Sequence, residues 1–282
     1  MRPHQYYKNS LIGICLVFAG ELFNISSYLK LTIGFVVLCF ISSSGYIIND
    51  ILDIEKDKKH PDKKSRPLPS GELSKFQALT GLIILNLIVL SSTFIVSSEF
   101  ILFSYSLFIS TFIYSFYAKN KPILDLMFVS INYVIRAVAG CIIIDEVISP
   151  WLLVCGFLFA LFLVTGKRYG DLMILGEEII NHKPVFEYYN EDFLKIILVI
   201  ATSTLVLSYA IYVIQTEYLI LVFSLPVFVY FIFSYLLVVL RTDEGKKPHK
   251  VLTRKEIIVS LLLLAIMAVL SIYFEDNILV LS

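Results

Sequence analysis

Four oxygen-bearing side chains close a long apolar run, within the stretch NDILDIEKD at residues 49–57. If the stretch is helical, Asp50, Asp53 and Asp57 recur at i, i+3 and i+7 and share one face, which Asn49 borders. Three carboxylates on one face repel each other, so a divalent cation is the expected counter-charge. Oxygen ligands suit Mg²⁺, which keeps several waters and shares itself with substrate phosphates. The stretch therefore predicts a magnesium site that holds a phosphorylated substrate.

The alternative interpretation of this stretch is a solvated helix end whose carboxylates face water, as most charged runs do. The stretch directly follows an apolar run and opens a strongly charged loop. Ionisable residues at the edge of a membrane segment are costly and often functional, so the location favours the magnesium site.

The composition is that of an integral membrane protein. Hydrophobic residues make up 58% of the 282 residues and charged residues 16%, and the mean hydropathy is +0.83. A soluble domain is nearer about half apolar and about a quarter charged. The formal net charge is zero, which indicates no nucleic-acid partner. The four cysteines lie in apolar stretches and the four histidines in polar ones, so neither a disulfide framework nor a zinc site is indicated.

Nine apolar segments have roughly the 17–25 residues that a bilayer span needs. A spanning segment must satisfy its own backbone, and strand-type alternation is absent, so we expect helices. Residues 1–282 are expected to form one all-α transmembrane domain, whose first apolar run stays as an anchor. The expected spans are 10–27, 31–52, 76–98, 101–118, 123–144, 150–169, 194–214, 218–240 and 256–274.

The basic residues mark one side of the membrane. All but two of the 23 Lys and Arg residues fall in alternate loops or in the helix ends beside them, and the exceptions are Lys30 and Arg136. Cytoplasmic loops carry the excess of Lys and Arg, so the N-terminus and the long loops are expected in the cytoplasm. We therefore expect a multi-pass protein of the cell (inner) membrane with a cytoplasmic active site. The basic loops are 1–9, 53–75, 119–122, 170–193 and 241–255.

The loop after the acidic stretch carries two candidate phosphate partners, Lys63 and Arg66. Three prolines in residues 60–71 favour an ordered turn here, and Ser74 with Gln77 has the pattern of a capping box for the third span. Arginine forks and lysine point charges are the usual partners of phosphate oxygens. The alternative is attraction of a polybasic loop to the membrane surface.

Two more candidate phosphate-binding pairs stand at span ends. Lys8 and Asn9 precede the first span, and Tyr114 and Lys119 close the fourth. Interfacial Lys and Tyr are also common membrane anchors, so each pair has this second interpretation.

Arg136 lies inside the fifth span, eleven residues after Asp125 and on nearly the same helical face. An intramembrane arginine needs a partner or a polar cavity. We expect Arg136 to face a cavity, where it either pairs with a carboxylate or binds a phosphate, and a purely structural ion pair is the alternative.

The sixth span ends in a second polar cluster, TGKRYGD at residues 165–171. Lys167 and Asp171 stand at i and i+4 and can share a face, and Arg168 adjoins them. Two such clusters on separate helices, facing each other at one membrane level, would clamp a magnesium diphosphate.

These motifs resemble those of the UbiA-type intramembrane prenyltransferases, whose first signature is NDxxDxxxD, as at residues 49–57. The chain is most similar to the decaprenyl-phosphate phosphoribosyltransferase branch of that superfamily. Four further motifs carry this similarity over roughly residues 1–175. They are RPxQYxKN at 2–9, HPxKxxRPxxSG at 60–71, YSxxxK…LD…RAxAG at 114–140 and KRxxD/E at 167–171.

The resemblance implies nine membrane helices around a central cavity that opens to the cytoplasm and laterally to lipid. It implies Mg²⁺-dependent transfer of phosphoribose from 5-phosphoribosyl diphosphate (PRPP) to a polyprenyl phosphate, with release of diphosphate. The implied metal ligands are Asn49, Asp50, Asp53 and Asp57, and the implied catalytic residues are Asp50, Asp53, Lys167 and Asp171. The implied phosphate-binding residues are Lys8, Asn9, Lys63, Arg66, Tyr114, Lys119, Arg136, Lys167 and Arg168.

This chain departs from the family pattern in two places. Asp171 stands where the family more often has Glu, which keeps the charge and shortens the reach. The loop at 241–255 is basic where the family carries an acidic residue near the loop's end, and Glu256 is the nearest candidate.

Two rival functions use the same features. A UbiA-type enzyme that moves a prenyl chain from its diphosphate to an aromatic or glycerol-type acceptor would use the same acidic stretch. A transporter could use Arg136 and the carboxylates as an ion path, but the charges gather at one face and no inverted repeat is apparent. A homo-oligomer is compatible with the sequence.

Overall fold

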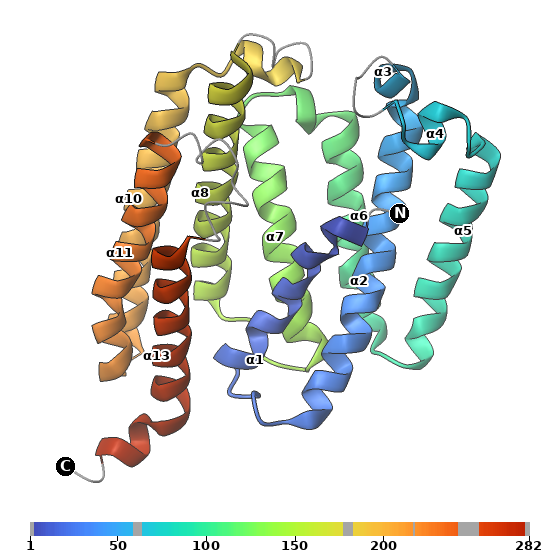
Figure 1. Ribbon diagram of the computed structural model, residues 1–282. Coiled ribbons are helices and arrows are strands. Elements are labelled where there is room, and N and C mark those ends of the chain that lie inside the picture. The colour runs from blue at the N-terminus through green and yellow to red at the C-terminus, as the bar shows by residue number, and fades with distance from the viewer. Residues whose placement is uncertain (1–2, 59–63, 177–182, 217, 242–253, 280–282) are drawn as a thin grey trace.

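The computed structural model describes residues 3–58, 64–176, 183–216, 218–241 and 254–279 (Figure 1). Within these ranges the regular structure is helical and contains no strand, which confirms the expected all-α class. Eight helices in this part of the chain are long and apolar enough to cross a membrane. They are α2 (Ile25–Leu52), α5 (Lys75–Ser91), α6 (Ser98–Phe116), α7 (Leu124–Ile143), α8 (Pro150–Leu175), α10 (Glu191–Gln215), α11 (Leu219–Arg241) and α13 (Lys255–Leu279).

The expected first span, 10–27, is wrong, and the second, expected at 31–52, ends as expected but begins at Ile25. The first segment consists of the 3₁₀ helix η1 (Pro3–Gly13) and the short helix α1 (Ile14–Phe18). Gly20 adopts a left-handed φ of 74°, where the chain turns back. Asn24 then caps α2 by accepting a hydrogen bond from the Ser26 amide at 3.0 Å. The described residues therefore hold this shorter segment in place of a full first span, and the count of nine spans is not confirmed.

Short elements gather at one end of the bundle, which we call the polar end (upper end in Figure 1). Besides α3 (Ile54–Lys58) and α4 (Pro67–Ser70), they include η3 (Ala118–Asn120) and η5 (Pro184–Glu187). α5 starts there with the predicted capping box, in which the Gln77 amide donates to Ser74 Oγ at 3.2 Å and the Ser74 amide donates to Gln77 Oε1 at 2.9 Å. At the opposite end, η2 (Ser92–Phe94) follows α5.

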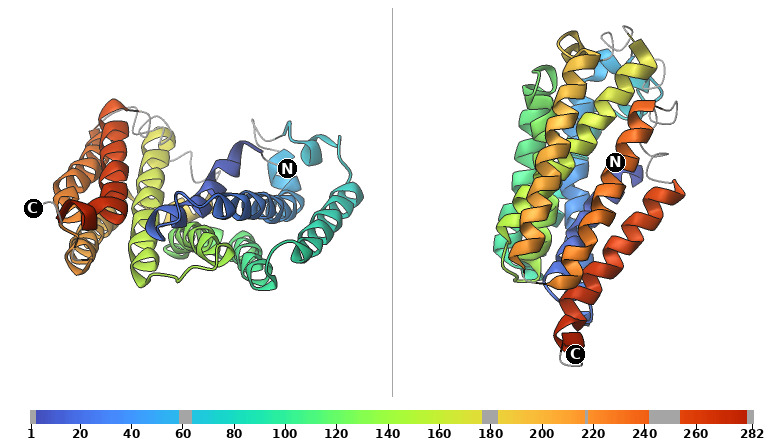
Figure 2. Two further views of the ribbon diagram at one scale, coloured as in Figure 1. Left: turned by 90° about the horizontal axis from the view of Figure 1, so that it is seen from below. Right: turned by 90° about the vertical axis from the view of Figure 1, so that its left-hand side faces the viewer.

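Seen along the bundle, the long helices form a curved row from α5 to α13, with η1 and α1 on its inner side (Figure 2). One apolar core joins η1 and α1 to α2, α6 and α7. A second core lies among α8, α10 and α11. Away from the polar end, Tyr273 of α13 accepts a hydrogen bond from the Leu22 amide at 2.7 Å and donates to the Leu16 carbonyl at 3.3 Å. The last described helix thus contacts the first segment.

A glycine fixes how the N-terminal segment sits on α7. A Cβ added to Gly140 would overlap the backbone carbonyl of Ile12, so only glycine allows this close approach. The approach places Asn9, three residues earlier in η1, against the buried face of α7. The backbone packing therefore determines which polar side chains meet inside the bundle.

The outward faces of the long helices are apolar. Leu87 of α5, Phe233 of α11 and Leu262 of α13 are each more than half exposed, at 60%, 57% and 57%. Such surfaces are favourable in hydrocarbon and unfavourable in water. Together with the eight long apolar helices, they define a multi-pass membrane protein.

Candidate active site

The acidic stretch lies where α2 passes into α3. The Asp53 amide donates to the Asn49 carbonyl at 3.0 Å, and the Asp57 amide donates to the Asp53 carbonyl at 2.7 Å. Helical hydrogen bonding therefore continues across the junction, and the acidic side chains stay at the polar end. The structure brings together the predicted residues Asn49, Asp50, Asp53 and Asp57 on one short segment.

Arg66 joins two of these carboxylates. Its Nη1 lies 2.6 Å from Asp57 Oδ2 and 3.4 Å from Asp50 Oδ1. The arginine precedes α4 in an extended conformation, and Pro67 occupies the first turn, so the loop folds back over α3. Asp57 is almost completely buried by this contact, with 4% of its side chain exposed. A sequence-predicted phosphate partner thus neutralises two sequence-predicted metal ligands.

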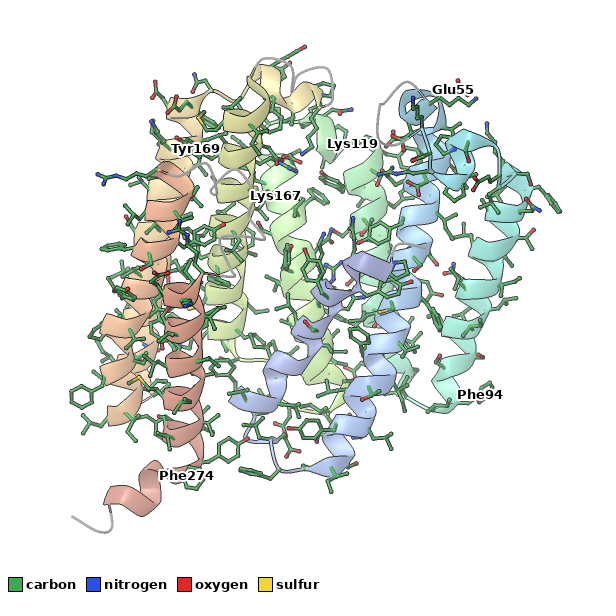
Figure 3. All side chains as sticks on the ribbon, in the orientation of Figure 1. Glu55, Phe94, Lys119, Lys167, Tyr169 and Phe274 are labelled. Carbon is green, nitrogen blue, oxygen red and sulfur yellow. The ribbon has the colours of Figure 1, made fainter. Side chains whose placement is uncertain are left out.

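Lys119 pairs with Asp53, the third of the predicted aspartate ligands. Its Nζ lies 2.9 Å and 3.0 Å from the two Asp53 oxygens. Lys119 belongs to η3, which follows α6, so this ion pair ties α6 to the end of α2. Figure 3 shows Lys119 at the polar end, with Glu55 farther along the same end. Glu55 is exposed and pairs with Lys58 at 2.9 Å.

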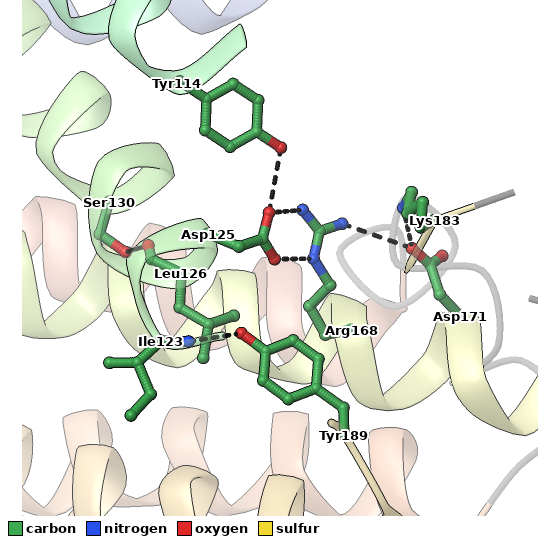
Figure 4. A network of polar contacts seen from close by, with 9 residues as sticks. All are labelled: Tyr114, Ile123, Asp125, Leu126, Ser130, Arg168, Asp171, Lys183 and Tyr189. Atoms are coloured by element: carbon green, nitrogen blue, oxygen red, sulfur yellow. Dashed lines mark hydrogen bonds and ion pairs between the residues drawn. The ribbon is translucent and has the colours of Figure 1, made fainter. Parts of the chain in front are cut away.

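The second cluster is a buried network around Asp125 (Figure 4). Arg168 of α8 donates from Nε and Nη2 to the two Asp125 oxygens at 2.8 and 2.9 Å, the bidentate geometry that suits a carboxylate. The Tyr114 hydroxyl donates to Asp125 at 3.0 Å. The predicted phosphate-binding residues Tyr114 and Arg168 thus meet on one carboxylate, and this pairing was not predicted.

Asp171 connects this network to the loop after α8. Arg168 Nη1 lies 3.6 Å from Asp171 Oδ2, and Lys183 Nζ lies 2.9 Å from the same oxygen. Burial lowers the pKa of Lys183 to about 8, and the nearby positive charge of Arg168 acts in the same direction. Although 41% of the lysine side chain is exposed, its ammonium end lies among these charged groups. No residue spacing identified Lys183 in advance, because it was one basic loop residue among many.

The start of α7, which carries Asp125, is held by a further contact at the polar end. Ile123 has a positive φ of 66°, which is unfavourable for a β-branched residue. Its amide donates to the Tyr189 hydroxyl at 2.9 Å. Burial raises the pKa of Tyr189 to about 12, so this hydroxyl is neutral at physiological pH.

Arg136 forms a third polar group, deeper in the bundle. Its Nε donates to Asn9 Oδ1 at 2.8 Å, a second hydrogen bond runs from Nη1 to the Asn132 carbonyl, and the guanidinium lies 6.0 Å from the Tyr133 ring centre. Among the residues that the structure describes, no carboxylate lies within ion-pair distance. The expected pairing of Arg136 with a carboxylate, including a purely structural ion pair, is therefore not found among these residues and stays a prediction.

The other predicted residues are distributed as follows. Lys8 contacts Gln5 at 3.4 Å, and the neighbouring Tyr6 hydroxyl lies 2.7 Å from Ser43 Oγ of α2. Lys167 is exposed at the polar end of α8 (Figure 3). Lys63 lies outside the described residues. In the described ranges no ion pair links the acidic stretch to Asp171.

The acidic stretch has the donor chemistry for Mg²⁺, because its side chains offer only oxygen ligands. In the described ranges no three His, Cys, Asp or Glu side chains are arranged to hold a metal ion. Instead, Arg66 and Lys119 neutralise the carboxylates. Metal binding by Asn49, Asp50, Asp53 and Asp57 therefore remains a prediction. Their oxygen donors are of the type that Mg²⁺ prefers.

The fold and the site define a helical multi-pass membrane protein whose acidic and basic side chains meet at one end of the bundle. The family model of the UbiA prenyltransferase family matches residues 10–255. The chain belongs to this family and is a transferase.

Named relatives and a solved structure agree with this assignment. The chain is 29% identical over 219 residues to decaprenyl-phosphate phosphoribosyltransferase of Corynebacterium glutamicum, which covers 75% of this chain and 65% of the relative. It is 27% identical to digeranylgeranylglyceryl phosphate synthase of Pyrococcus abyssi over 162 residues, and the match covers 56% of this chain and 56% of the relative. A UbiA homolog from Archaeoglobus fulgidus bound to GPP and Mg²⁺ has the same fold, with a TM-score of 0.71, 18% identity and coverage of 95% of this chain and 97% of that one.

Proposed function

We propose that this enzyme transfers 5-phosphoribose from PRPP to a polyprenyl phosphate, releasing diphosphate and forming polyprenyl-phosphoryl-5-phosphoribose. The observation that carries the proposal is the pairing of acids with bases in the acidic stretch. A magnesium diphosphate brings both a cation for the aspartates and an anion for Arg66 and Lys119, so it can replace both sets of partners. The phosphoribosyltransferase relative supports PRPP as the source of that diphosphate.

The reaction needs electrostatic stabilisation more than acid–base chemistry. A phosphate oxygen of the lipid bonds to C1 of the ribose, the bond from C1 to the diphosphate oxygen breaks, and the electron pair leaves with the diphosphate. Preorganised positive charge stabilises such a leaving group most strongly in a water-poor site. Arg66, Lys119 and Lys167 are the residues that we assign to this role. The nucleophile is already an anion, so no strong general base is required.

Asn49, Asp50, Asp53 and Asp57 would hold the Mg²⁺ of this reaction. Bound there, the ion would neutralise charge on the diphosphate. Asp171, fixed by Arg168 and Lys183, would form the other wall of the site. Because the basic loops mark the cytoplasmic side, PRPP would enter from the cytoplasm of a cell with this inner-membrane protein, and the lipid from the bilayer.

The alternative is transfer of a prenyl chain from its diphosphate, which the glyceryl phosphate synthase relative supports. Purified protein with Mg²⁺ is given labelled PRPP and polyprenyl phosphate in one reaction, and labelled prenyl diphosphate with aromatic or glycerol-type acceptors in another. We expect label to enter lipid in the first reaction. Label transfer only in the second would replace the proposed function by the alternative.

Substitutions in the acidic stretch test the metal and diphosphate roles. We expect Asp50→Asn and Asp53→Asn each to lower turnover by at least about 100-fold, the scale for losing one electrostatic group of an active site. Glu55→Gln is the matched control, because it removes an exposed carboxylate of the same segment. Full activity of both aspartate variants would contradict the proposed role of the stretch.

A further inference from the structure

Two of the four cysteines meet where the N-terminal segment packs on α7. Cys15 belongs to α1 and Cys141 to the last turn of α7, and their side chains are hydrogen-bonded to each other. Both thiols are free and buried. They lie in the apolar core that joins the N-terminal segment to α2, α6 and α7. Their spacing in the sequence did not predict this contact, because the two residues lie on segments far apart in the chain.

Backbone packing brings the two cysteines together. At Gly140, the residue before Cys141, an added Cβ would overlap the Ile12 carbonyl, so the two backbones touch there. Cys15 follows Ile12 by three residues and continues the same side of the N-terminal segment along α7. A disulfide requires Cα atoms within about 7 Å of each other and Cβ atoms that point toward one another. Touching backbones and facing thiols are the arrangement that such a bond needs.

The pair lies at the end of the bundle opposite the polar end, where α1 packs on α7 (Figure 1). Cys141 precedes the end of α7 by two residues, roughly 3 Å along the helix axis. Its carbonyl accepts a hydrogen bond at 2.9 Å from the amide of Glu146, in the loop that follows. The basic loops predict a cytoplasmic polar end, so the cysteine pair is predicted to lie toward the extracytoplasmic side. Disulfides persist on that side of a cell membrane, whereas cytosolic thiols are kept reduced.

The other two cysteines have different surroundings. Cys39 of α2 is as buried as Cys15, with 4% of each residue exposed, but it accepts a hydrogen bond from Asn9 Nδ2 at 3.3 Å. Cys155 of α8 is partly exposed. Burial of a cysteine in this fold therefore does not by itself bring a second thiol to it. The alternative is that Cys15 and Cys141 only fill space in the core, as buried cysteines commonly do.

We propose that Cys15 and Cys141 are a redox pair that closes into a disulfide and fastens the N-terminal segment to α7. Each thiol gives up its proton and one electron, and a bond forms between the two sulfurs. Both protons and both electrons pass to an oxidant that is itself a disulfide, which is reduced to two thiols. Because the packed thiols are buried, the bond forms before the N-terminal segment closes on α7, or through an oxidant small and apolar enough to enter the core. This role goes beyond the proposed function, whose reaction uses neither thiol.

A small apolar disulfide tests the bond in the full-length protein. The protein is purified in detergent under reducing conditions, freed of reductant and treated with 2,2′-dithiodipyridine. By mass spectrometry we expect two peptides linked through Cys15 and Cys141, with two hydrogen atoms fewer than the separate peptides. Cys39 and Cys155 should be recovered as thiols or as pyridyl mixed disulfides. Recovery of Cys15 and Cys141 only in these two forms would overturn the proposal.

Two variants and a denatured sample test whether the fold directs the bond. In Cys155→Ala, which removes the partly exposed cysteine, the link between Cys15 and Cys141 should form as in the wild type. In Cys15→Ala, Cys141 should be recovered without a link. A link from Cys155 to Cys141 in comparable yield in the wild type would mean that exposure directs the reaction, and would overturn the pair. If Cys15→Ala does not fold, the denatured wild type decides, because the same distribution of links in folded and denatured protein would overturn the pair.

Thermal unfolding shows whether the bond fits the packed structure. The oxidised wild type should unfold at least about 3 °C above the same sample reduced with a dithiol, because a disulfide restricts the unfolded chain. This difference should match the wild type in Cys155→Ala and stay below about 1 °C in Cys15→Ala. An oxidised wild type no more stable than the reduced one would show that the bond strains the packing, and would overturn its role as a native fastening.

Discussion

Arg136 and Arg168 are equally buried, with 6% of each residue exposed, yet they are compensated in different ways. Arg168 is held by the two oxygens of Asp125, so its charge is balanced within the fold. Within the described ranges, the hydrogen-bond partners of Arg136 are an amide oxygen and a carbonyl oxygen. A buried ion pair that the chain completes by itself serves the structure. A buried charge for which the described residues provide no counter-charge points to a ligand. The residue type, arginine in both cases, does not distinguish these two situations.

Removing the carboxylate from Arg168 should have the largest effect on stability. Asp125→Asn keeps the shape and leaves the guanidinium with only the longer contact to Asp171 at 3.6 Å, and breaking a buried pair in this way costs about 3–5 kcal/mol. The loss is measured as a lower unfolding temperature in detergent. Asp145→Asn is the control, because Asp145 is in an exposed pair and asparagine tolerates its positive φ of 62°. The control should cost less than about 1 kcal/mol. If Asp125→Asn and Asp145→Asn lowered the stability equally, the charge of Asp125 would not be needed to hold Arg168 in the fold.

Moving Asn9 away from Arg136 without changing any charge should have an intermediate effect on stability. In Gly140→Ala the new methyl group would overlap the Ile12 carbonyl, so η1 must shift, at a cost of roughly 1–3 kcal/mol. Gly81→Ala meets open space in α5 and should stay within about 1 kcal/mol of wild type. Unfolding temperatures of the two variants check this. A Gly140→Ala protein as stable as Gly81→Ala would show that η1 does not depend on the close approach.

The smallest expected effect is the pH dependence due to Lys183, which adds a third cation to the comparison. Its pKa is about 8 in the folded protein, against an ordinary value of 10.5. Between these values the unfolded chain binds more protons, so this lysine makes stability rise with pH from about 8 to 10.5. We expect the rise to be smaller in Lys183→Met, measured by unfolding temperatures across that range. Identical pH profiles would show that the Asp171 contact compensates the burial.

Much of the fold and part of the site followed from the sequence. The apolar runs from residue 75 onward and the capping box at Ser74 depend on local patterns, and both appear as expected. The first segment differed because the left-handed turn at Gly20 and the Asn24 cap shorten it, and one weak apolar run does not show where such a turn falls.

The partners of the charged residues could not be predicted. Lys119 lies 66 residues from Asp53, and Arg168 lies 43 residues from Asp125. Such contacts depend on which helices become neighbours, and local periodicity carries no information about that. The resemblance identified residue types at the site, whereas the packing decided which acid meets which base.

The packing of the N-terminal segment against Gly140 imposes an order on folding during synthesis. Asn9 is made early, but its arginine lies 127 residues later in the chain. Because the N-terminal part of a chain is synthesised first, η1 cannot pack against α7 until α7 has been made. Asn9 can meet Cys39 and Ser42 of α2 in that interval, but its contact with Arg136 can form only once about half of the protein has been made.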